Sequence, residues 1–369
     1  MSWYHANARA LPWRGTADPY HIWVSEIMLQ QTRVAAVIDH YNEFLRRFPT
    51  LVSLALAPEA DVLAAWSGLG YYRRARMLHK AAQFIMTERR GTLPASSAEL
   101  LTLPGIGEYT AAAIASIAFG ENVAVVDGNV ERVVLRLTGR PSEDTAAAHA
   151  FLRAQAQALM PRARVQLSRR DQLSAFAPGA PLPANPAGDH NQAMMELGAT
   201  VCLPHEPRCS QCPLDPLCLT RGEHPTPQRA PQRSQPVACL LDLRKRGTAT
   251  EVLLERRPDA AAVMPAMYEL PPLPLDAVEG LEPALRIRHS ITNTNYYVQV
   301  FSSRRSASGS AGKRNGAAAQ ALRSALPADS GDLHWTRTTS LAGLPLTGLT
   351  RKILMRLKIM TNILVALPE

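Results

Sequence analysis

Hydrophobic positions in the first half of the chain recur every three to four residues, as they do in amphipathic helices. Segments with this spacing follow one another from about residue 18 to about residue 160, and none of them alternates like a strand. After residue 237 the pattern changes to short runs rich in β-branched and aromatic residues, at 237–243, 251–255, 285–287 and 296–302. The pattern therefore predicts an all-α part followed by a small α+β part.

Two stretches interrupt this pattern. Residues 161–187 are rich in Pro, Arg and Ala and have no periodicity, so we expect a disordered surface insertion. Residues 223–236 are rich in Pro, Gln and Arg and read as a linker. The predicted organisation is a helical domain over 1–222, a linker over 223–236 and a second domain over 237–369.

Composition and charge narrow the kind of protein. Hydrophobic residues make up 46% of the 369 residues, which is enough for real cores, and the net charge of +9 suits a polyanionic partner. Most of this charge lies late in the chain, because residues 1–222 have a net charge of +2 and residues 223–369 have +7. No apolar run approaches the roughly 20 residues of a membrane span, and no signal peptide is evident. We therefore expect a cytoplasmic protein without a membrane partner.

The stretch from 103 to 129 contains two adjacent signals. Pro104, Gly105 and Gly107 predict a tight turn before an apolar, buried helix. The amides of the turn would lie at a helix start without intrahelical partners, which suits a phosphate. An ordinary glycine turn between two helices is the alternative. Asp127-Gly128-Asn129 then places a carboxylate at the start of the next helix.

Four cysteines lie close together in the pattern C-x6-C-x2-C-x5-C, at Cys202, Cys209, Cys212 and Cys218. Four thiolates at this density indicate a metal centre rather than disulfides. From the spacing alone, zinc and a [4Fe–4S] cluster are both compatible, with His205 as a spare ligand. The fifth cysteine, Cys239, lies in an apolar run and is expected in a core.

Two carboxylates are candidates for chemistry. Glu26 lies among the apolar residues Ile22, Trp23 and Ile27, a setting that raises the pKa of a carboxyl group and makes it an acid near neutral pH. A solvated surface glutamate is the alternative. Asp127 is placed like a helix cap, and a cap can also act in catalysis.

The hairpin carries a family resemblance. Leu-Pro-Gly-Ile-Gly together with Val-Asp-Gly-Asn-Val resembles the helix-hairpin-helix of the endonuclease III and MutY superfamily of DNA glycosylases. The resemblance implies that the amides around Gly105 and Gly107 bind one DNA strand. The cysteine spacing matches the [4Fe–4S] loop at the end of that domain, so the resemblance implies this cofactor.

The stretch Trp-Val-Ser-Glu-Ile-Met-Leu-Gln-Gln-Thr around Glu26 resembles the adenine glycosylase branch. The resemblance implies that Glu26 protonates the leaving adenine and handles the attacking water, that Asp127 stabilises the sugar cation, and that Asn129 orients them. Related lyases have a lysine at the position of Tyr109, which attacks the sugar as an amine. A tyrosine cannot form an imine, so we expect a monofunctional enzyme in which Tyr109 belongs to the catalytic site.

Further DNA contacts follow from the same resemblance. Gln31 and Thr32, the latter also a potential cap of the next helix, correspond to residues that probe the base opposite the target. Leu69 and Tyr71 in Gly-Leu-Gly-Tyr-Tyr correspond to the wedge that fills the gap when a base is flipped. Arg73 follows them and is a candidate phosphate contact. Simple packing is the alternative for the wedge residues, and a solvated helix face is the alternative for Arg73.

The second half resembles the Nudix-like recognition domain of MutY enzymes, on the basis of Met-Pro-Ala-Met-Tyr-Glu-Leu-Pro at 264–271 and Arg-His-Ser-Ile-Thr-Asn at 288–293. The glutamate cluster of a Nudix hydrolase is absent. Where the family commonly has Phe-Ser-His against 8-oxoguanine, this chain has Ile291-Thr292-Asn293, with Thr292 as the hydrogen-bonding residue.

Together these features predict an adenine DNA glycosylase of base excision repair with a [4Fe–4S] cluster. Its expected substrate is double-stranded DNA with adenine opposite 8-oxoguanine or guanine, and we expect a monomer associated with the nucleoid. The alternatives are an endonuclease III-like pyrimidine glycosylase and lyase, or a non-catalytic iron–sulfur DNA-binding protein.

Overall fold

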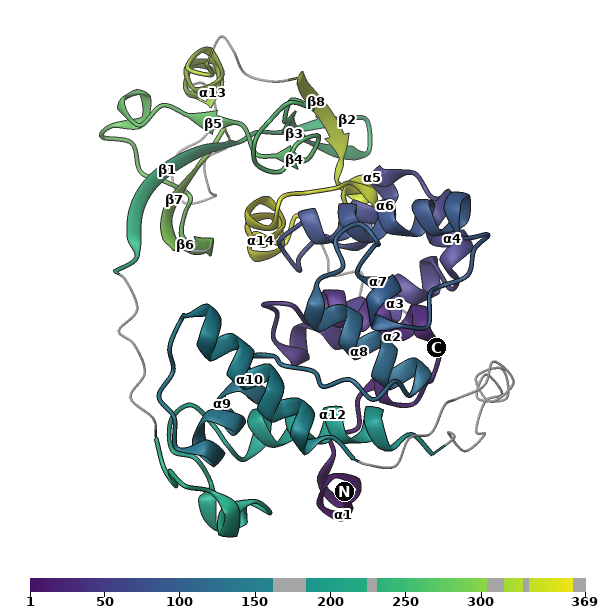
Figure 1. Cartoon of the computed structure of the whole chain (residues 1–369). Coiled ribbons are helices and arrows are strands. Elements are labelled where there is room, and N and C mark those ends of the chain that lie inside the picture. The colour runs from purple at the N-terminus through teal and green to yellow at the C-terminus, as the bar shows by residue number, and fades with distance from the viewer. Residues whose placement is uncertain (162–183, 224–230, 292, 304–314, 328–331, 361–369) are drawn as a thin grey trace. The chain divides into compact units, whose positions relative to one another are not determined.

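The computed structural model describes residues 1–161, 184–223, 231–291, 293–303, 315–327 and 332–360 (Figure 1). Its contacts divide the chain into two compact units. The first contains Met1–Leu56 and Met77–Gln228, and the second contains Ala57–Arg76 and Arg229–Glu369. The segment Ala57–Arg76, which the sequence placed in the helical domain, therefore makes its compact contacts with the C-terminal part. The expected domain boundaries at 222 and 237 stay a prediction.

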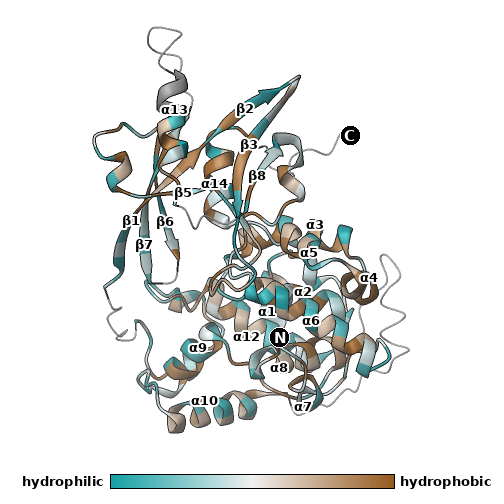
Figure 2. Ribbon diagram, turned by 90° about the horizontal axis from the view of Figure 1, so that it is seen from above, coloured by the Kyte–Doolittle hydropathy of each residue, from teal (hydrophilic) through white to brown (hydrophobic). Residues whose placement is uncertain are grey.

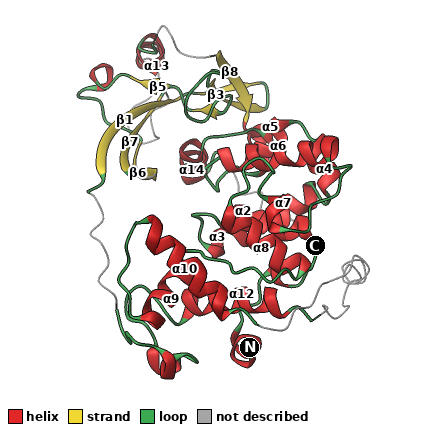
Figure 3. Cartoon of the chain, viewed as in Figure 1, coloured by secondary structure: helices red, strands yellow, loops and turns green. Residues whose placement is uncertain are grey.

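The first unit is built from helices, as the hydrophobic spacing predicted, and Figure 3 shows the strands confined to the C-terminal part. Its helices are α1 (Ser2–Asn7), η1 (Pro12–Arg14), α2 (Pro19–Leu29), α3 (Val34–Arg47), α4 (Leu51–Leu56), most of α6 (Arg73–Glu88), α7 (Ser97–Leu100), α8 (Glu108–Phe119), α9 (Gly128–Thr138), α10 (Ala146–Leu159), α12 (Pro186–Thr200), η2 (Cys209–Gln211) and η3 (Asp215–Leu217). Most of the predicted insertion at 161–187 lies outside the described residues.

Short polar residues decide where several of these helices start. Asp18 caps α2 by accepting the amide of Tyr20, and the next residue, Pro19, fits the first helical position. Thr32 does not cap the following helix, contrary to expectation, because the N-cap of α3 is Arg33. The Thr32 hydroxyl instead donates to the carbonyl of Gln30 at 3.3 Å.

Helix α8 is the centre of the first unit. Its side chains are apolar nearly all round, so it is buried nearly all round and contacts α2, α7 and α12. It ends at Gly120, whose φ of 74° is the left-handed conformation of a C-terminal cap. A second apolar cluster joins α9, α10 and α12. This packing brings α2, the start of α8 and the start of α9 into one core.

The second unit contains two small sheets and a few helices. Its elements are α5 (Glu59–Ala65), β1 (Arg233–Leu241), β2 (Leu243–Arg246), β3 (Ala249–Arg256), β4 (Tyr268–Glu269), β5 (Pro272–Leu273), η4 (Asp276–Val278), β6 (Leu285–Ile291), β7 (Thr294–Ser302), α13 (Asn315–Ser324), β8 (Asp332–Arg337), η5 (Thr338–Gly343) and α14 (Gly348–Arg356). One sheet has the order β5-β1-β7-β6 with β1 and β7 parallel, and in the other β3 pairs with β2, β4 and β8.

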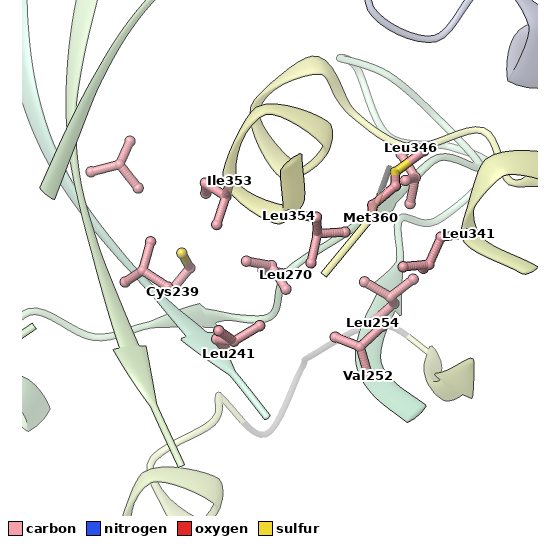
Figure 4. Packing of buried hydrophobic residues seen from close by; sticks show 12 residues of the cluster. Cys239, Leu241, Val252, Leu254, Leu270, Leu341, Leu346, Ile353, Leu354 and Met360 are labelled. Atoms are coloured by element: carbon pink, nitrogen blue, oxygen red, sulfur yellow. The ribbon is translucent and has the colours of Figure 1, made fainter. Parts of the chain in front are cut away.

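The core of this unit lies against α14. Apolar side chains of β1, β3 and β7 meet Ile353 and Leu354 of α14 and Leu346 just before it (Figure 4). Helix α14 therefore packs on the sheets of this unit. Cys239 is buried in the same cluster, as expected. Figure 2 shows that β1 is hydrophilic in its first half and hydrophobic in its second, which matches the burial along the strand.

None of the helices within the described ranges has the length and apolar character that a bilayer span requires.

Candidate active site and cysteine loop

Glu26 lies inside α2 and is buried, with 4% of its surface exposed. The surrounding α2 residues, from Ile22 to Met28, are also buried. Burial in this apolar setting raises the pKa of the Glu26 carboxyl from 4.5 to about 7. A carboxyl group with a pKa near neutrality can both give up and take back a proton at neutral pH, which is the property required of a general acid.

Tyr109, at the start of α8, is the direct partner of this acid. Its hydroxyl donates to Oε2 of Glu26 at 2.5 Å, and the bond joins residues 83 positions apart. Burial and the neighbouring Glu26 carboxyl raise the pKa of Tyr109 well above its ordinary value, so the phenol stays protonated. Tyr109 therefore orients the Glu26 carboxyl group. Its hydrogen bond lowers the pKa of Glu26, but burial raises that pKa by more.

Asp127 and Asn129, at the start of α9, complete the candidate site. Asp127 is the N-cap of α9 and its Oδ1 accepts the amide of Val130 at 2.7 Å. Its Oδ2 accepts the side-chain amide of Asn129 at 2.8 Å, while Oδ1 of Asn129 accepts a guanidinium proton of Arg132. The charge of Asp127 also raises the pKa of Glu26. The predicted cap therefore lies within electrostatic reach of the predicted acid, and the structure brings the four predicted catalytic residues together.

A buried ion cluster beside this site was missed from the sequence. Glu196 of α12 has no exposed side-chain surface and accepts two hydrogen bonds at 2.7 Å from Arg9 and one at 2.7 Å from Arg14. Burial alone would raise the pKa of Glu196, but the hydrogen bonds from both arginines outweigh it and bring the pKa to about 2. Arg14 also lowers the pKa of Glu26. The sequence holds no clear signal of this cluster, because α12 also carries Asp189, His190, Asn191 and Gln192, among which Glu196 does not stand out.

The hairpin before α8 has the geometry that its glycines predicted. Gly105 has φ of 76°, and a Cβ atom there would lie 2.5 Å from Cβ of Met77, so the backbone is closely packed on that side. Gly107 is the N-cap of α8, and a Cβ atom there would meet nothing within 4 Å. The first amides of α8 thus start from an exposed turn, as a phosphate site requires.

The remaining predicted DNA contacts lie on different units. In the first unit, Gln31 is exposed with φ of 54°, two residues after the end of α2, and Thr32 is half-buried. In the second unit, Tyr71 is 44% exposed and Arg73 is exposed, whereas Leu69 is only 7% exposed and already packed. Thr292 lies outside the described residues. These assignments stay predictions.

The four clustered cysteines line one cavity, together with Arg136, Val201, Pro207, Asp215 and Gly222. Within the described part of the chain, no three His, Cys, Asp or Glu side chains come close enough to hold a single metal ion. The predicted spare ligand, His205, does not line this cavity, and its ring lies 3.4 Å from a carboxylate oxygen of Glu223.

Two arginines of α9 hold the cysteine loop, and no sequence pattern pointed to them. Arg136 is buried and donates to Sγ of Cys202 at 3.2 Å and to the carbonyl of Leu203 at 2.7 Å. Arg132 donates to the carbonyl of Cys202 at 2.7 Å. Because Arg132 also contacts Asn129, the helix that starts at Asp127 connects the loop with the candidate active site.

The hairpin and Glu26 lie in a segment of the chain that matches a known family of DNA repair proteins. Residues 24–155 match the family model described as HhH-GPD superfamily base excision DNA repair protein. A thermostable thymine-DNA glycosylase of known structure is similar in fold, with a TM-score of 0.50 and 28% sequence identity over 59% of this chain and 91% of its own.

The particular family follows from two relatives. Adenine DNA glycosylase of Mycobacterium tuberculosis is 37% identical over 254 residues, which are 69% of this chain and 76% of that protein. Human adenine DNA glycosylase is 43% identical over 230 residues, or 60% of this chain, but these residues cover only 38% of the human protein. The chain belongs to the adenine DNA glycosylase family, and it matches about two fifths of the length of the human relative.

Proposed function

We propose that this protein removes adenine from DNA by hydrolysing its N-glycosidic bond. The observation that carries the proposal is the buried Glu26 carboxyl, with a pKa of about 7, held by the Tyr109 hydroxyl and close to the charge of Asp127. An N-glycosidic bond breaks through a sugar cation, so the reaction needs a proton for the leaving base and negative charge near the sugar. Glu26 and Asp127 supply these two functions.

The proton comes from Glu26 in its neutral form. Because Oε2 accepts the tyrosine hydroxyl, Oε1 is the oxygen from which a proton can pass to the ring nitrogen of a flipped adenine. Protonation makes the base a better leaving group, and the carboxylate formed in this step can then accept a proton from the attacking water. The reaction therefore requires protonated Glu26 first and ionised Glu26 afterwards, which a pKa near neutrality permits.

Asp127 is suited to stabilise the sugar cation because its position is fixed by three donors. The amides of Asn129 and Val130 and the side chain of Asn129 all donate to its carboxylate. A preorganised charge of this kind stabilises a developing opposite charge without having to reorient during the reaction. Asn129 thus positions the carboxylate and leaves the acid–base steps to Glu26.

The proposed enzyme is monofunctional. A strand-cleaving lyase needs an amine that attacks the sugar and forms an imine. At the start of α8 the residue that faces Glu26 is Tyr109, whose phenol is protonated and cannot form an imine. The products would be free adenine and an intact strand with an abasic site.

We further propose that the cysteine loop holds a [4Fe–4S] cluster. The four thiols line one cavity, and the spacing of the cysteines matches the [4Fe–4S] loop of the family that this chain resembles. Cys202, Cys209, Cys212 and Cys218 would hold the cluster. Its function would be structural, because Arg132 and Arg136 tie this loop to α9.

The proposed substrate is double-stranded DNA in which adenine lies opposite 8-oxoguanine or guanine. The basic C-terminal half, with net charge +7 over residues 223–369, supports a DNA-binding function for the α+β domain. We propose that this domain is a Nudix-like recognition domain and that the protein acts as a monomer in the cytoplasm, at the nucleoid.

The test is base release from a defined duplex. The purified protein is incubated with DNA carrying one adenine opposite 8-oxoguanine, and hot alkali then cleaves the strand at any abasic site. We expect cleavage at the adenine with the wild type and none with Glu26→Gln. No cleavage by a protein that retains its cysteine-bound cofactor would contradict the proposal.

Two controls separate the alternatives. An endonuclease III-like lyase would be trapped covalently on DNA by borohydride, whereas we expect no adduct. A non-catalytic DNA-binding protein would show no difference between the wild type and Glu26→Gln. A zinc site would leave the protein colourless, whereas an iron–sulfur cluster would give a brown protein that absorbs at roughly 400 nm.

A further inference from the structure

The turn that carries Tyr71 is held in an unusual conformation. Gly68, Gly70 and Tyr71 have φ of 111°, 71° and 49°, so three of four consecutive residues are in the left-handed region. A tyrosine in that region is strained and stays there only where its surroundings determine the conformation. The result is an exposed Tyr71 beside the packed Leu69.

Two buried hydroxyls on either side of this turn share one acceptor. Ser67 Oγ donates to the carbonyl of Leu346 at 3.1 Å, and the Tyr72 hydroxyl donates to the same carbonyl at 2.9 Å. The Tyr72 oxygen also accepts the amide of Gly68 at 3.5 Å. Ser67, Tyr72 and Leu346 are exposed by 2%, 4% and 0%, so water cannot replace these bonds easily.

The shared acceptor is itself fixed by the C-terminal sheet and helix. Leu346 forms a bridge with Tyr268 of β4, and the amide of Thr347 donates to the carbonyl of Tyr268 at 2.9 Å. Thr347 then caps α14 through the amide of Thr350. Because the Leu346 side chain also lies in the core cluster of Figure 4, its carbonyl cannot turn away without disturbing that core.

Other contacts in the same unit keep the segment in place. Arg76 donates to the carbonyl of Pro265 at 2.6 Å, and helix α5 packs against η5. Arg74 lies over the rings of Trp66 and Tyr71 at 5.6 and 5.4 Å and donates to the carbonyl of Gly70. The segment between α5 and α6 is thus built onto the C-terminal part of the chain, although Ser67 lies 279 residues before Leu346.

We infer that Ser67 and Tyr72 are positioning residues that lock the Gly68–Tyr71 turn to the Leu346 carbonyl, so that Tyr71 is presented to DNA in one conformation. The inference rests on the proposed function and on the wedge role that the family resemblance implies for Leu69 and Tyr71, which fill the gap when a base is flipped. A turn that is ordered before DNA binds loses little conformational entropy when Tyr71 enters the DNA. The C-terminal domain therefore contributes to base extrusion through this turn, in addition to any contact of its own with DNA.

The test uses the full chain with Ser67→Ala and Tyr72→Phe combined, which removes both hydroxyls and keeps the aromatic ring. Tyr20→Phe is the matched control, because the buried Tyr20 hydroxyl donates to the Phe48 carbonyl at 2.8 Å in the other unit. Amide hydrogen exchange of residues 67–72 is measured without DNA. Base extrusion is measured in a Glu26→Gln background, from the fluorescence of 2-aminopurine at the target position.

We expect the double variant to exchange its turn amides about tenfold faster or more and to shift the extrusion equilibrium back by about tenfold, since two buried hydrogen bonds are lost. The control should change neither quantity. Unchanged exchange at the turn would overturn the inference, and so would faster exchange with unchanged extrusion. If the double variant does not fold, each single variant should show part of both effects. Failure of the wild type to release adenine would instead refute the proposed function, while the exchange result would still report on the lock.

Discussion

Replacing Glu26 by glutamine should change the pH dependence of stability in a way that follows from its burial. Folding raises the pKa of this carboxyl from 4.5 to about 7. At about 1.4 kcal/mol for each tenfold change in the ionisation constant, the ionised form is disfavoured in the folded state by roughly 3 kcal/mol. Glutamine has a similar shape and does not ionise.

The direction of this pH dependence follows from the number of protons that the folded and unfolded states bind at Glu26. Between pH 4.5 and about 7 the folded state binds more protons at Glu26 than the unfolded state, so wild-type stability falls as the pH rises through this range. The free-energy cost of ionising the buried Glu26 carboxyl is absent below pH 4.5 and is reached in full above about pH 7. We therefore expect the free energy of unfolding of Glu26→Gln, relative to the wild type, to rise by roughly 3 kcal/mol between pH 4.5 and pH 8.

Urea unfolding followed by tryptophan fluorescence, repeated across this pH range, measures the difference. Other titrating groups are common to both proteins and cancel. Glu88→Gln, at an exposed position in α6, controls for the loss of one carboxylate and should run parallel to the wild type. A Glu26→Gln difference that stays constant within about 0.5 kcal/mol would refute the argument, because it would mean that Glu26 is not an acid with a raised pKa. The same variant should lose base release by about a hundredfold or more.

Three further predictions concern the rest of the site. Tyr109→Phe removes the hydroxyl that lowers the pKa of Glu26, so the alkaline limb of a single-turnover pH–rate profile should move to higher pH; an unchanged limb would contradict the assigned hydrogen bond. Asp127→Asn keeps a good helix cap and should alter stability by less than about 1 kcal/mol while slowing base release about 10² to 10³-fold, as thermal unfolding and kcat would reveal together. Gly105→Ala should destabilise the protein by about 1 to 3 kcal/mol, because it adds both a backbone strain and a clash. Gly107→Ala, where space is open, should leave stability unchanged and weaken DNA binding in a filter assay; equal effects of the two would contradict the hairpin assignment.

Much of the candidate site could be predicted from the sequence because its signals are local. The glycines before α8, the Asp127 cap of α9 and the closely spaced cysteines each depend on residues that are neighbours in the chain. The apolar surroundings of Glu26 within its own helix were enough to indicate a raised pKa. Helical spacing up to residue 160 also gave the all-α architecture of the first unit, since each turn of helix buries residues a few positions apart.

What only the tertiary structure decided are the contacts between distant residues. The Glu26 and Tyr109 pair joins positions 83 apart, the Glu196 and Arg9 pair joins positions 187 apart, and the Ser67 and Leu346 pair joins positions 279 apart. The sequence also gave no sign that segment 57–76 packs with the C-terminal part. The hydrophobic pattern of an element shows which of its faces is buried. A hydrogen bond between distant side chains forms only where packing has brought their elements together. The spacing of residues along the chain does not show which elements pack together.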